Sequence, residues 1–558
     1  MTYATSRDDA FSKKIEAAIE DFASQYQLNA YSSVPRRTIF LFPGGLGSEL
    51  MRSYQAYPGA AQSFEKVWLD AGIWTGDIPH LTMQPGGVDT DQKYIVPSGC
   101  VNVPGPVSFL HSYEIFIQWC RRNSIDLFVF GWDWRRSVQD AADFFLNVFM
   151  PKFDARFTGT PHPLDHFSFV GHSAGGMVIK AMLNCTANQY VQRVKKAITV
   201  ATPFYGYGGQ IHRFLKGDPY LLVALILPSV SAAIVSSLPG GYEYPYLGYQ
   251  TYLDNKQAFE HDQDQYNLNA YPSVDAGDPT KIADPYDYDP LPDANGKVRY
   301  PLLYGFNSSL LNQGHVTAQS ISRPFTSAEA TIASKFFNIR GVQTRNGGTI
   351  DVNKTPVGQS WARVSPLFSA DLDLDPIQDQ LGPGDGTQPA WTTRLLGLPN
   401  PANQIITIKG DDLDHATILD NVDVRVRIAA LIGLDPTIMD FDDDVFGLAD
   451  LAATFEEFSK FMNEITKLAD VGRDFMPEQL GWPAYQQSIA RRKVYLQQYT
   501  PAELQGLLAR FYLEAVNHPG KMRTSSKDDK RPVSKGEKPT DPKREKPAEH
   551  DRGPAGKK

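Results

Sequence analysis

The chain has 558 residues, 42% apolar and 21% charged, which is typical of a globular protein and excludes a disordered or collagen-like one. The three cysteines, Cys100, Cys120 and Cys185, are too few and too scattered for a disulfide framework or a zinc site, so we expect reduced thiols. The net charge is −9, but segment 521–558 carries 13 Lys/Arg and 7 Asp/Glu. With +6 on that segment, the remainder is at −15, which argues against nucleic acid as the main partner.

The first residues, "MTYATSRDDAFSKKIEAAIEDF", hold no apolar core ahead of a small-residue cleavage site. We therefore expect no secretory signal, a cytoplasmic protein, and an N-terminal helical extension over 1–36. The uncharged run "LLVALILPSVSAAIVSSL" at 221–238 has the length of a membrane span. Pro228 interrupts it and serines dilute it, so a buried or lid helix pair is the preferred interpretation.

Apolar runs alternate with amphipathic helical stretches, and this pattern predicts an α/β fold with a mostly parallel sheet. Six runs are expected to be strands: "TIFLFPGG" (38–45), "IDLFVFGWDW" (125–134), "HFSFVGHS" (166–173), "KAITVATPF" (196–204), "KFFNIRGVQT" (335–344) and "QIITIKGDD" (404–412).

Three segments fall outside this alternation. Residues 205–334 are rich in Pro, Tyr, Asp and Gly and are expected to form a cap or lid insertion in a 37–437 domain. Residues 438–519 contain two amphipathic helical patterns, which predict a helical appendage. The basic tail 520–558 has almost no large apolar residue and is expected to be disordered, either as a solubilising tail or as a weak contact to an anionic surface.

The stretch "FVGHSAGGMVIKAML" (169–183) contains Gly-x-Ser-x-Gly between a strand-like run and a helix-like run. In that context the pattern predicts a sharp turn that presents the Ser173 hydroxyl at the sheet edge, next to a helix N-terminus. A serine at its ordinary pKa needs a base, and the base needs an orienting acid. Ser173 is therefore a candidate nucleophile.

The expected chain order is Ser, then acid, then His. His415, in "DDLDHATIL" after the last predicted strand, is the best-placed base among the histidines that follow Ser173. Asp385, between two glycines in "LGPGDGTQPAWT", is the favoured acid. Its nearby competitors are Asp371, Asp373, Asp375 and Asp379. For the oxyanion hole we expect the backbone N–H groups of Ala174 and of Gly45, in "FPGGLGSEL".

In order along the chain, the pieces "FLFPGGLGSEL", "VWLD", "FGWDWRRS", "VGHSAGG", "VATPFYG", "GDGT" and "DLDHATIL" resemble the lecithin:cholesterol acyltransferase family. Relatives of that family include lysosomal phospholipase A2 and phospholipid:diacylglycerol acyltransferase. The resemblance covers about residues 37–435. Trp132 stands where the family usually has Tyr, and the lid disulfide of the secreted members is absent.

The resemblance implies an α/β-hydrolase fold with lid and cap insertions and an acyl-enzyme on Ser173. It implies a phospholipid or other lipid ester as substrate, with water or an alcohol as acyl acceptor. The helical appendage and the basic tail are candidates for a transient contact with a membrane surface. Candidate substrate-contacting residues are Leu46, Trp132, His172 and Phe204. No metal or organic cofactor is indicated. The alternatives are an esterase for a soluble ester and a non-catalytic effector or binding module on the same fold.

Overall fold

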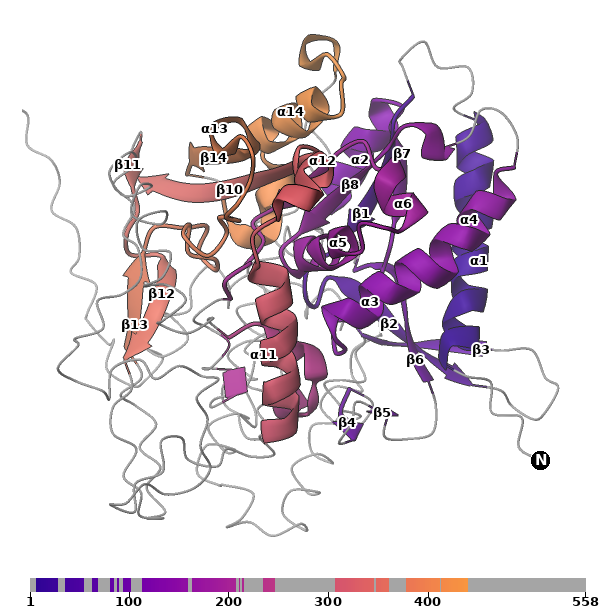
Figure 1. Cartoon of the computed structure of the whole chain (residues 1–558), viewed down its shortest axis with the longest axis horizontal. Helices are drawn as coiled ribbons and strands as arrows, with labels where there is room; N and C mark the ends of the chain where they lie inside the picture. The colour runs from indigo at the N-terminus through magenta and orange to yellow at the C-terminus, as the bar shows by residue number, and fades with distance from the viewer. Residues whose placement is uncertain are drawn as a thin grey trace, which may run out of the picture.

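A mostly parallel β-sheet runs through the centre of the computed structural model (Figure 1). All pairings in this sheet are parallel except the short one between β10 and β11. In spatial order its strands are β11 (Thr349–Ile350), β10 (Phe336–Arg345), β9 (Ala197–Val200), β8 (Phe167–His172), β1 (Thr38–Phe42) and β7 (Asp126–Val129). A seventh strand, β14 (Ile405–Gly410), also pairs with β10.

The structure describes residues 7–28, 36–54, 63–68, 81–84, 88–89, 94–101, 113–158, 163–206, 210, 213–214, 234–245, 307–345, 348–360, 378–411 and 413–439.

Each of the six predicted strands is present, and the parallel sheet with helices on both sides confirms the α/β class. Along β1, alternate side chains point to opposite faces of the sheet, as a two-residue period requires. Phe40 and Phe42 join an aromatic-rich core on one face, and Ile39 and Leu41 join an aliphatic core on the other. Both faces are buried, which explains why this strand is apolar throughout.

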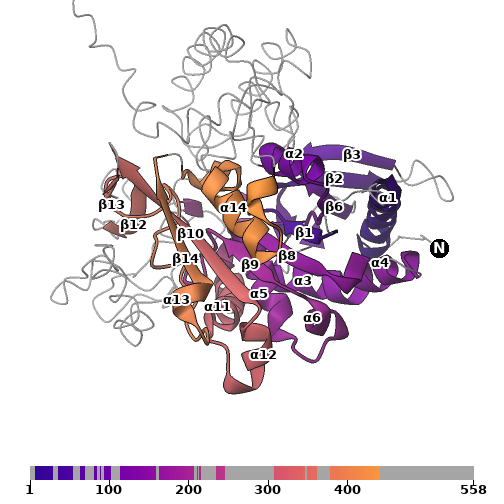
Figure 2. The ribbon, with the colours of Figure 1, turned by 90° about the horizontal axis from the view of Figure 1, so that it is seen from above.

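Helices cover the two faces unequally (Figure 2). The aliphatic face is covered by α2 (Glu114–Arg122) and α14 (Val422–Leu431). The aromatic face is covered by α1 (Arg7–Leu28), α3 (Val138–Phe144), α4 (Met150–Arg156), α5 (Ala174–Asn184), α6 (Gln189–Arg193), α11 (Ser308–Ser322) and α12 (Ala330–Ala333). Helix α1 lies within the segment predicted as an N-terminal extension, and its Phe22 packs against Phe128 of β7.

Smaller antiparallel pieces, which the sequence patterns did not predict, flank the main sheet. A three-stranded sheet has the order β3 (Ser63–Trp68), β2 (Ser48–Tyr54) and β6 (Tyr94–Cys100). Two-stranded pieces are formed by β4 (Met83–Gln84) with β5 (Val88–Asp89) and by β12 (Thr355–Ser360) with β13 (Gln378–Gly382). The short α13 (Pro401–Gln404) leads directly into β14.

Several sequence predictions fall wholly or partly outside the described residues. The predicted helical appendage is described only at 438–439, and the basic tail is not described at all. Of the predicted cap insertion, 205–206, 210, 213–214, 234–245 and 307–334 are described. Within the described part of the chain, no helix combines the length and apolarity that a bilayer crossing requires. The three cysteines are free thiols.

The first turn of α5 lies so close to the end of β1 that the contact restricts which residues can stand there. A Cβ atom built on Gly175, in the first turn of α5, would lie 2.1 Å from the carbonyl oxygen of Phe42 and 2.6 Å from that of Pro43. Real Cβ atoms do not approach backbone oxygens so closely, so only glycine allows this helix to start beside the strand end.

We therefore expect Gly175→Ala to lower the free energy of unfolding by roughly 1–3 kcal/mol or more, because the added methyl group must push two backbone segments apart. Gly45→Ala is the matched control. Its Cβ would meet its nearest neighbours at 3.8 Å, an ordinary van der Waals distance. Urea unfolding of the two variants and the wild type checks this, and equal midpoints for both variants would contradict the steric argument.

Candidate active site

Ser173 occupies the turn between β8 and α5, and its backbone is strained there. Its φ of 52° and ψ of −128° are values that a residue with a side chain rarely adopts. The turn is held by a hydrogen bond from the Ser173 N–H to the carbonyl of Val200 at 2.8 Å. Gly171 leaves room for it, since a Cβ there would lie 2.8 Å from both the carbonyl carbon and the carbonyl oxygen of Gly175. The strand, turn and helix predicted from Gly-x-Ser-x-Gly are all present.

His415 and Asp385 form a hydrogen-bonded row with Ser173. His415 Nε2 lies 2.9 Å from Ser173 Oγ, and His415 Nδ1 lies 2.7 Å from Asp385 Oδ2. A carboxylate oxygen accepts, so Nδ1 carries the proton and Nε2 faces the serine hydroxyl as an acceptor. The backbone N–H of His415 also donates to the backbone carbonyl of Asp385 at 2.8 Å. The structure thus brings together the three residues that the sequence selected.

Asp385 reaches the histidine through a detour in the chain. Between β10 and Asp385 lies the β12–β13 pair, and the chain then returns to β10, where the Gln343 N–H donates to the Gly384 carbonyl at 2.8 Å. The other carboxylate oxygen, Oδ1, accepts from the N–H groups of Thr387 at 3.1 Å and Gln388 at 2.6 Å. Asp385 is 1% exposed, so these bonds fix the carboxylate in a site sheltered from water.

The loop after β1 approaches the N-terminus of α5. A Cβ built on Gly45 would lie 3.8 Å from Ala174 Cβ and 3.8 Å from the hydroxyl of Tyr244. Among the described residues, no hydrogen bond engages the N–H of Gly45 or of Ala174. Gly45 and Ala174 therefore lie next to each other beside Ser173, and the role of their N–H groups as oxyanion donors stays a prediction.

Three tryptophan indoles hold this loop from behind. Their N–H groups donate to three backbone carbonyls between residues 43 and 48: Trp132 to Pro43 at 2.7 Å, Trp68 to Leu46 at 2.8 Å and Trp134 to Ser48 at 3.2 Å. Bonds from rigid, buried rings keep the loop backbone in one conformation. The Trp-containing segments "VWLD" and "FGWDWRRS" thus support the loop that carries Gly45.

A buried ion-pair cluster holds the tryptophan segment in turn. Arg135 is fully buried, and its guanidinium lies 2.8 Å from both Asp133 and Asp89. Burial alone would lower the pKa of Arg135, but the carboxylates of Asp133 and Asp89 raise it above the ordinary value for an arginine. Truncating one partner of such a cluster would leave a buried charge without compensation.

The four residues predicted to contact substrate lie at different depths. Trp132 and Phe204 are buried in the core, and Phe204 packs edge-on against Phe336. Leu46 is half-buried with a φ of 66°. His172 is buried, and both of its ring nitrogens are hydrogen-bonded within the protein. Substrate contact by these residues stays a prediction.

Tyr113, which the sequence analysis missed, bonds to the site from the start of α2. Its hydroxyl lies 2.9 Å from His172 Nδ1 and accepts from the Gly44 N–H at 2.7 Å. No local pattern marks this residue, because its partners lie far away along the chain.

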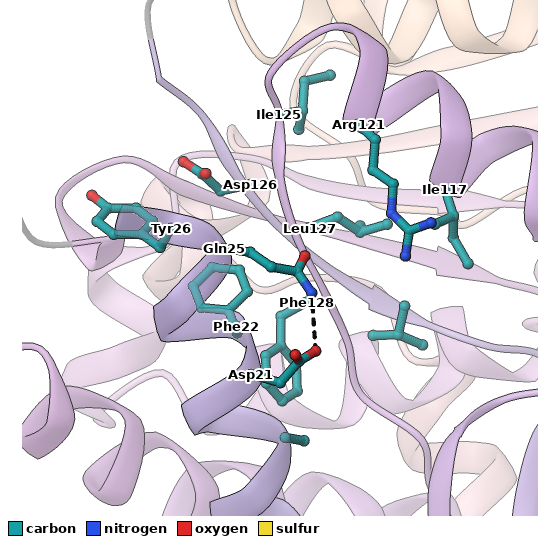
Figure 3. Close-up of a pocket in the computed structure, with 12 residues that line it drawn as sticks. Asp21, Phe22, Gln25, Tyr26, Ile117, Arg121, Ile125, Asp126, Leu127 and Phe128 are labelled. Carbon is teal, nitrogen blue, oxygen red and sulfur yellow. Dashed lines mark hydrogen bonds between the residues drawn. The ribbon is translucent and has the colours of Figure 1, made fainter. Parts of the chain in front are cut away.

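A separate cavity of about 350 Å³ lies beside the edge strand β7 (Figure 3). It is lined by residues of α1, α2 and β7, with Ile125 between the last two. None of the residues of the Ser173 row lines it, so this cavity is not the substrate pocket of that row.

Burial, and secondarily the charge of His415, lowers the pKa of His172 to about 3. The unfolded chain takes up this proton near pH 6.5, so the stability that neutral His172 contributes is present above about pH 6.5 and lost as pH falls toward 3. We expect the wild type to lose up to about 1.4 kcal/mol per pH unit more than His172→Gln below that point. Urea unfolding between about pH 7 and pH 4.5 measures the difference, and parallel curves would contradict it.

No protein-family model matches the sequence, and none of the curated proteins matches it. Among solved structures, the crystal structure of the Tle4–Tli4 complex is similar at 13% identity and a TM-score of 0.34, over 73% of this chain and 100% of that one. The peroxisomal α/β-hydrolase Lpx1 from Saccharomyces cerevisiae is similar at 11% identity and a TM-score of 0.20, over 77% of this chain and 86% of that one. Both are distant likenesses in shape.

Proposed function

We propose that this chain is a serine hydrolase of the α/β-hydrolase superfamily that cleaves carboxylic esters through an acyl-enzyme on Ser173. The observation that carries the proposal is the row from Ser173 Oγ to His415 to Asp385, with separations of 2.9 and 2.7 Å. A nucleophile, a base with a fixed tautomer and a buried orienting acid are the three parts that this chemistry needs.

In the first half-reaction, Ser173 Oγ attacks the ester carbonyl while His415 Nε2 takes its proton. The carbonyl oxygen becomes negatively charged and is held by the N–H groups of Gly45 and Ala174. Asp385 stabilises the imidazolium without taking its proton. The C–O bond of the ester then breaks, and His415 delivers the proton to the departing alkoxide, which leaves an acyl group on Ser173.

In the second half-reaction, water or an alcohol attacks the acyl-enzyme. His415 takes the proton of the attacking hydroxyl and returns it to Ser173 Oγ when the acyl group departs. Water gives a carboxylic acid and an alcohol gives a new ester, so the same residues serve hydrolysis and acyl transfer.

We propose a lipid ester as the substrate, in the manner of a phospholipase A or an acyltransferase similar to lecithin:cholesterol acyltransferase. Two features of the sequence support this: the ordered set of resembling segments from 40 to 419, and the uncharged apolar run at 221–238. An acyl chain gains about 0.8 kcal/mol for each buried CH₂ group, so contact with apolar side chains favours long chains. The site itself would serve a soluble ester equally well, and the test must separate the two.

We expect a long-chain fluorophosphonate to form a single adduct on Ser173, because the activated hydroxyl displaces fluoride from phosphorus. Mass spectrometry should show the adduct in the wild type and in His166→Ala, a control at the opposite end of β8, and not in Ser173→Ala or His415→Ala. Protection by phospholipid vesicles identifies a lipid enzyme, and protection by a short-chain ester alone identifies a soluble esterase. A folded wild type that forms no adduct would instead favour a non-catalytic module.

We expect Asp385→Asn to slow labelling by roughly three to four orders of magnitude, because an amide in place of the carboxylate favours the wrong imidazole tautomer. The losses should not add, since the row acts as one unit. Labelling of the double variant Asp385→Asn/His415→Ala should therefore be as slow as that of His415→Ala alone. A rate for Asp385→Asn within tenfold of the wild type would show that another group orients His415.

A further inference from the structure

Two buried side chains outside the Ser173 row connect two of the loops at the site. Tyr113 Oη lies between the Gly44 N–H at 2.7 Å and His172 Nδ1 at 2.9 Å. On the other side of the same ring, His172 Nε2 lies 2.8 Å from the carbonyl oxygen of His415. The contacts therefore run unbroken from the loop after β1, through Tyr113 and His172, to the loop after β14.

The proton on each of these atoms follows from its partner. A carbonyl oxygen can only accept, so His172 Nε2 carries a hydrogen and donates it to His415. Burial keeps the ring neutral, with a pKa lowered to about 3, so Nδ1 offers a lone pair. The Tyr113 O–H donates to that lone pair while its oxygen accepts from the Gly44 N–H. Each donor in the series thus faces an acceptor.

We infer that Tyr113 and His172 are positioning residues, which hold the Gly45 loop and the His415 loop in fixed places on either side of Ser173. The inference rests on the proposed function for its kinetic consequence. His172 thereby acts by positioning two loops, whereas the sequence predicted that it contacts the substrate.

The turn that carries Gly45 is built around the Tyr113 hydroxyl. The Gly47 N–H donates to the Gly44 carbonyl at 3.0 Å and closes the turn, and a Cβ on Gly47 would lie 2.8 Å from Tyr113 Oη. The Tyr113 hydroxyl occupies the Gly44 N–H, and the next residue, Gly45, lies beside Ala174, since a Cβ built on it would be 3.8 Å from Ala174 Cβ. Under the proposed function, the hydroxyl therefore fixes the turn that carries the Gly45 N–H.

The backbone of His415 is held at both of its polar groups. Its N–H donates to Asp385 and its carbonyl accepts from His172, both at 2.8 Å. Two bonds on opposite sides of one residue fix the direction of its Cα–Cβ bond, and so the position of Nε2 relative to Ser173 Oγ. A misplacement of about 1 Å at such a centre can cost about 100-fold in rate.

Tyr113→Phe tests the inference because it removes one oxygen and preserves the ring. The matched control is Tyr242→Phe. The Tyr242 hydroxyl is also buried, accepts from a backbone N–H, that of Asn307 at 2.9 Å, and donates to the Ser236 carbonyl at 2.7 Å. We expect both variants to fold, with comparable decreases in Tm.

The kinetic readout is the labelling of Ser173 by the fluorophosphonate, with its concentration dependence. For Tyr113→Phe we expect the maximal labelling rate to fall about 10- to 100-fold with little change in the half-saturating concentration, because positioning affects the reacting atoms and not the acyl chain. Tyr242→Phe should label within about twofold of the wild type. His172→Gln preserves a donor toward His415, and its combination with Tyr113→Phe should be no slower than the slower single variant.

A second readout does not depend on activity. Hydrogen exchange measured by mass spectrometry should be about tenfold faster or more in Tyr113→Phe at 44–47 and also at 413–420, a segment that Tyr113 reaches only through His172. Tyr242→Phe should leave both segments unchanged. Unchanged exchange at 413–420 in Tyr113→Phe would overturn the inference, and so would equal labelling by the two Phe variants. If the wild type itself is not labelled, the proposed function fails, and the exchange result alone decides whether the loops are coupled.

Discussion

The contact between the first turn of α5 and the end of β1 is the constraint on which the site depends. Gly175 lets the helix start against the carbonyl groups of Phe42 and Pro43. Ser173 directly precedes helix α5, and Gly45 lies in the loop that follows strand β1. One close packing contact therefore sets both the nucleophile and the neighbouring backbone amides. A larger residue at 175 would move the two halves of the site apart.

Hydrogen bonds from mostly buried polar groups then hold the loops of the site in place. Indole N–H groups donate to the backbone of the loop after β1, and the Tyr113 hydroxyl, at the start of α2, accepts from it. His172 continues this support to the loop after β14. Each bond occupies a group that would otherwise be buried without a partner, so these positions tolerate little substitution. The strained φ of Ser173 persists because the surroundings fix it so completely.

Short-range signals made the strands and the nucleophile turn predictable. An apolar run, a turn with glycines and an apolar helix lie within 169–183, and nothing outside that stretch is needed to identify them. The choice of His415 and Asp385 used chain order and the places where strands end. The same reasoning missed the β2–β3–β6 sheet, whose strands "SELMRSY", "SFEKVW" and "YIVPSGC" show little regular alternation. It also missed Tyr113, because a lone tyrosine before a helix has no distinctive spacing.

The sequence by itself determined the α/β class, the six strands and the identities of three residues that lie in one hydrogen-bonded row. These depend on periodicity and on turn chemistry, which act between neighbours in the chain. Only the tertiary structure decided that Trp132 supports a loop, that Asp385 follows the antiparallel β12–β13 pair and returns to β10, and that His172 bonds to Tyr113 and His415. Hydrogen bonds between distant segments depend on angles and on tenths of an ångström, which the packing of the whole core sets and no local pattern encodes.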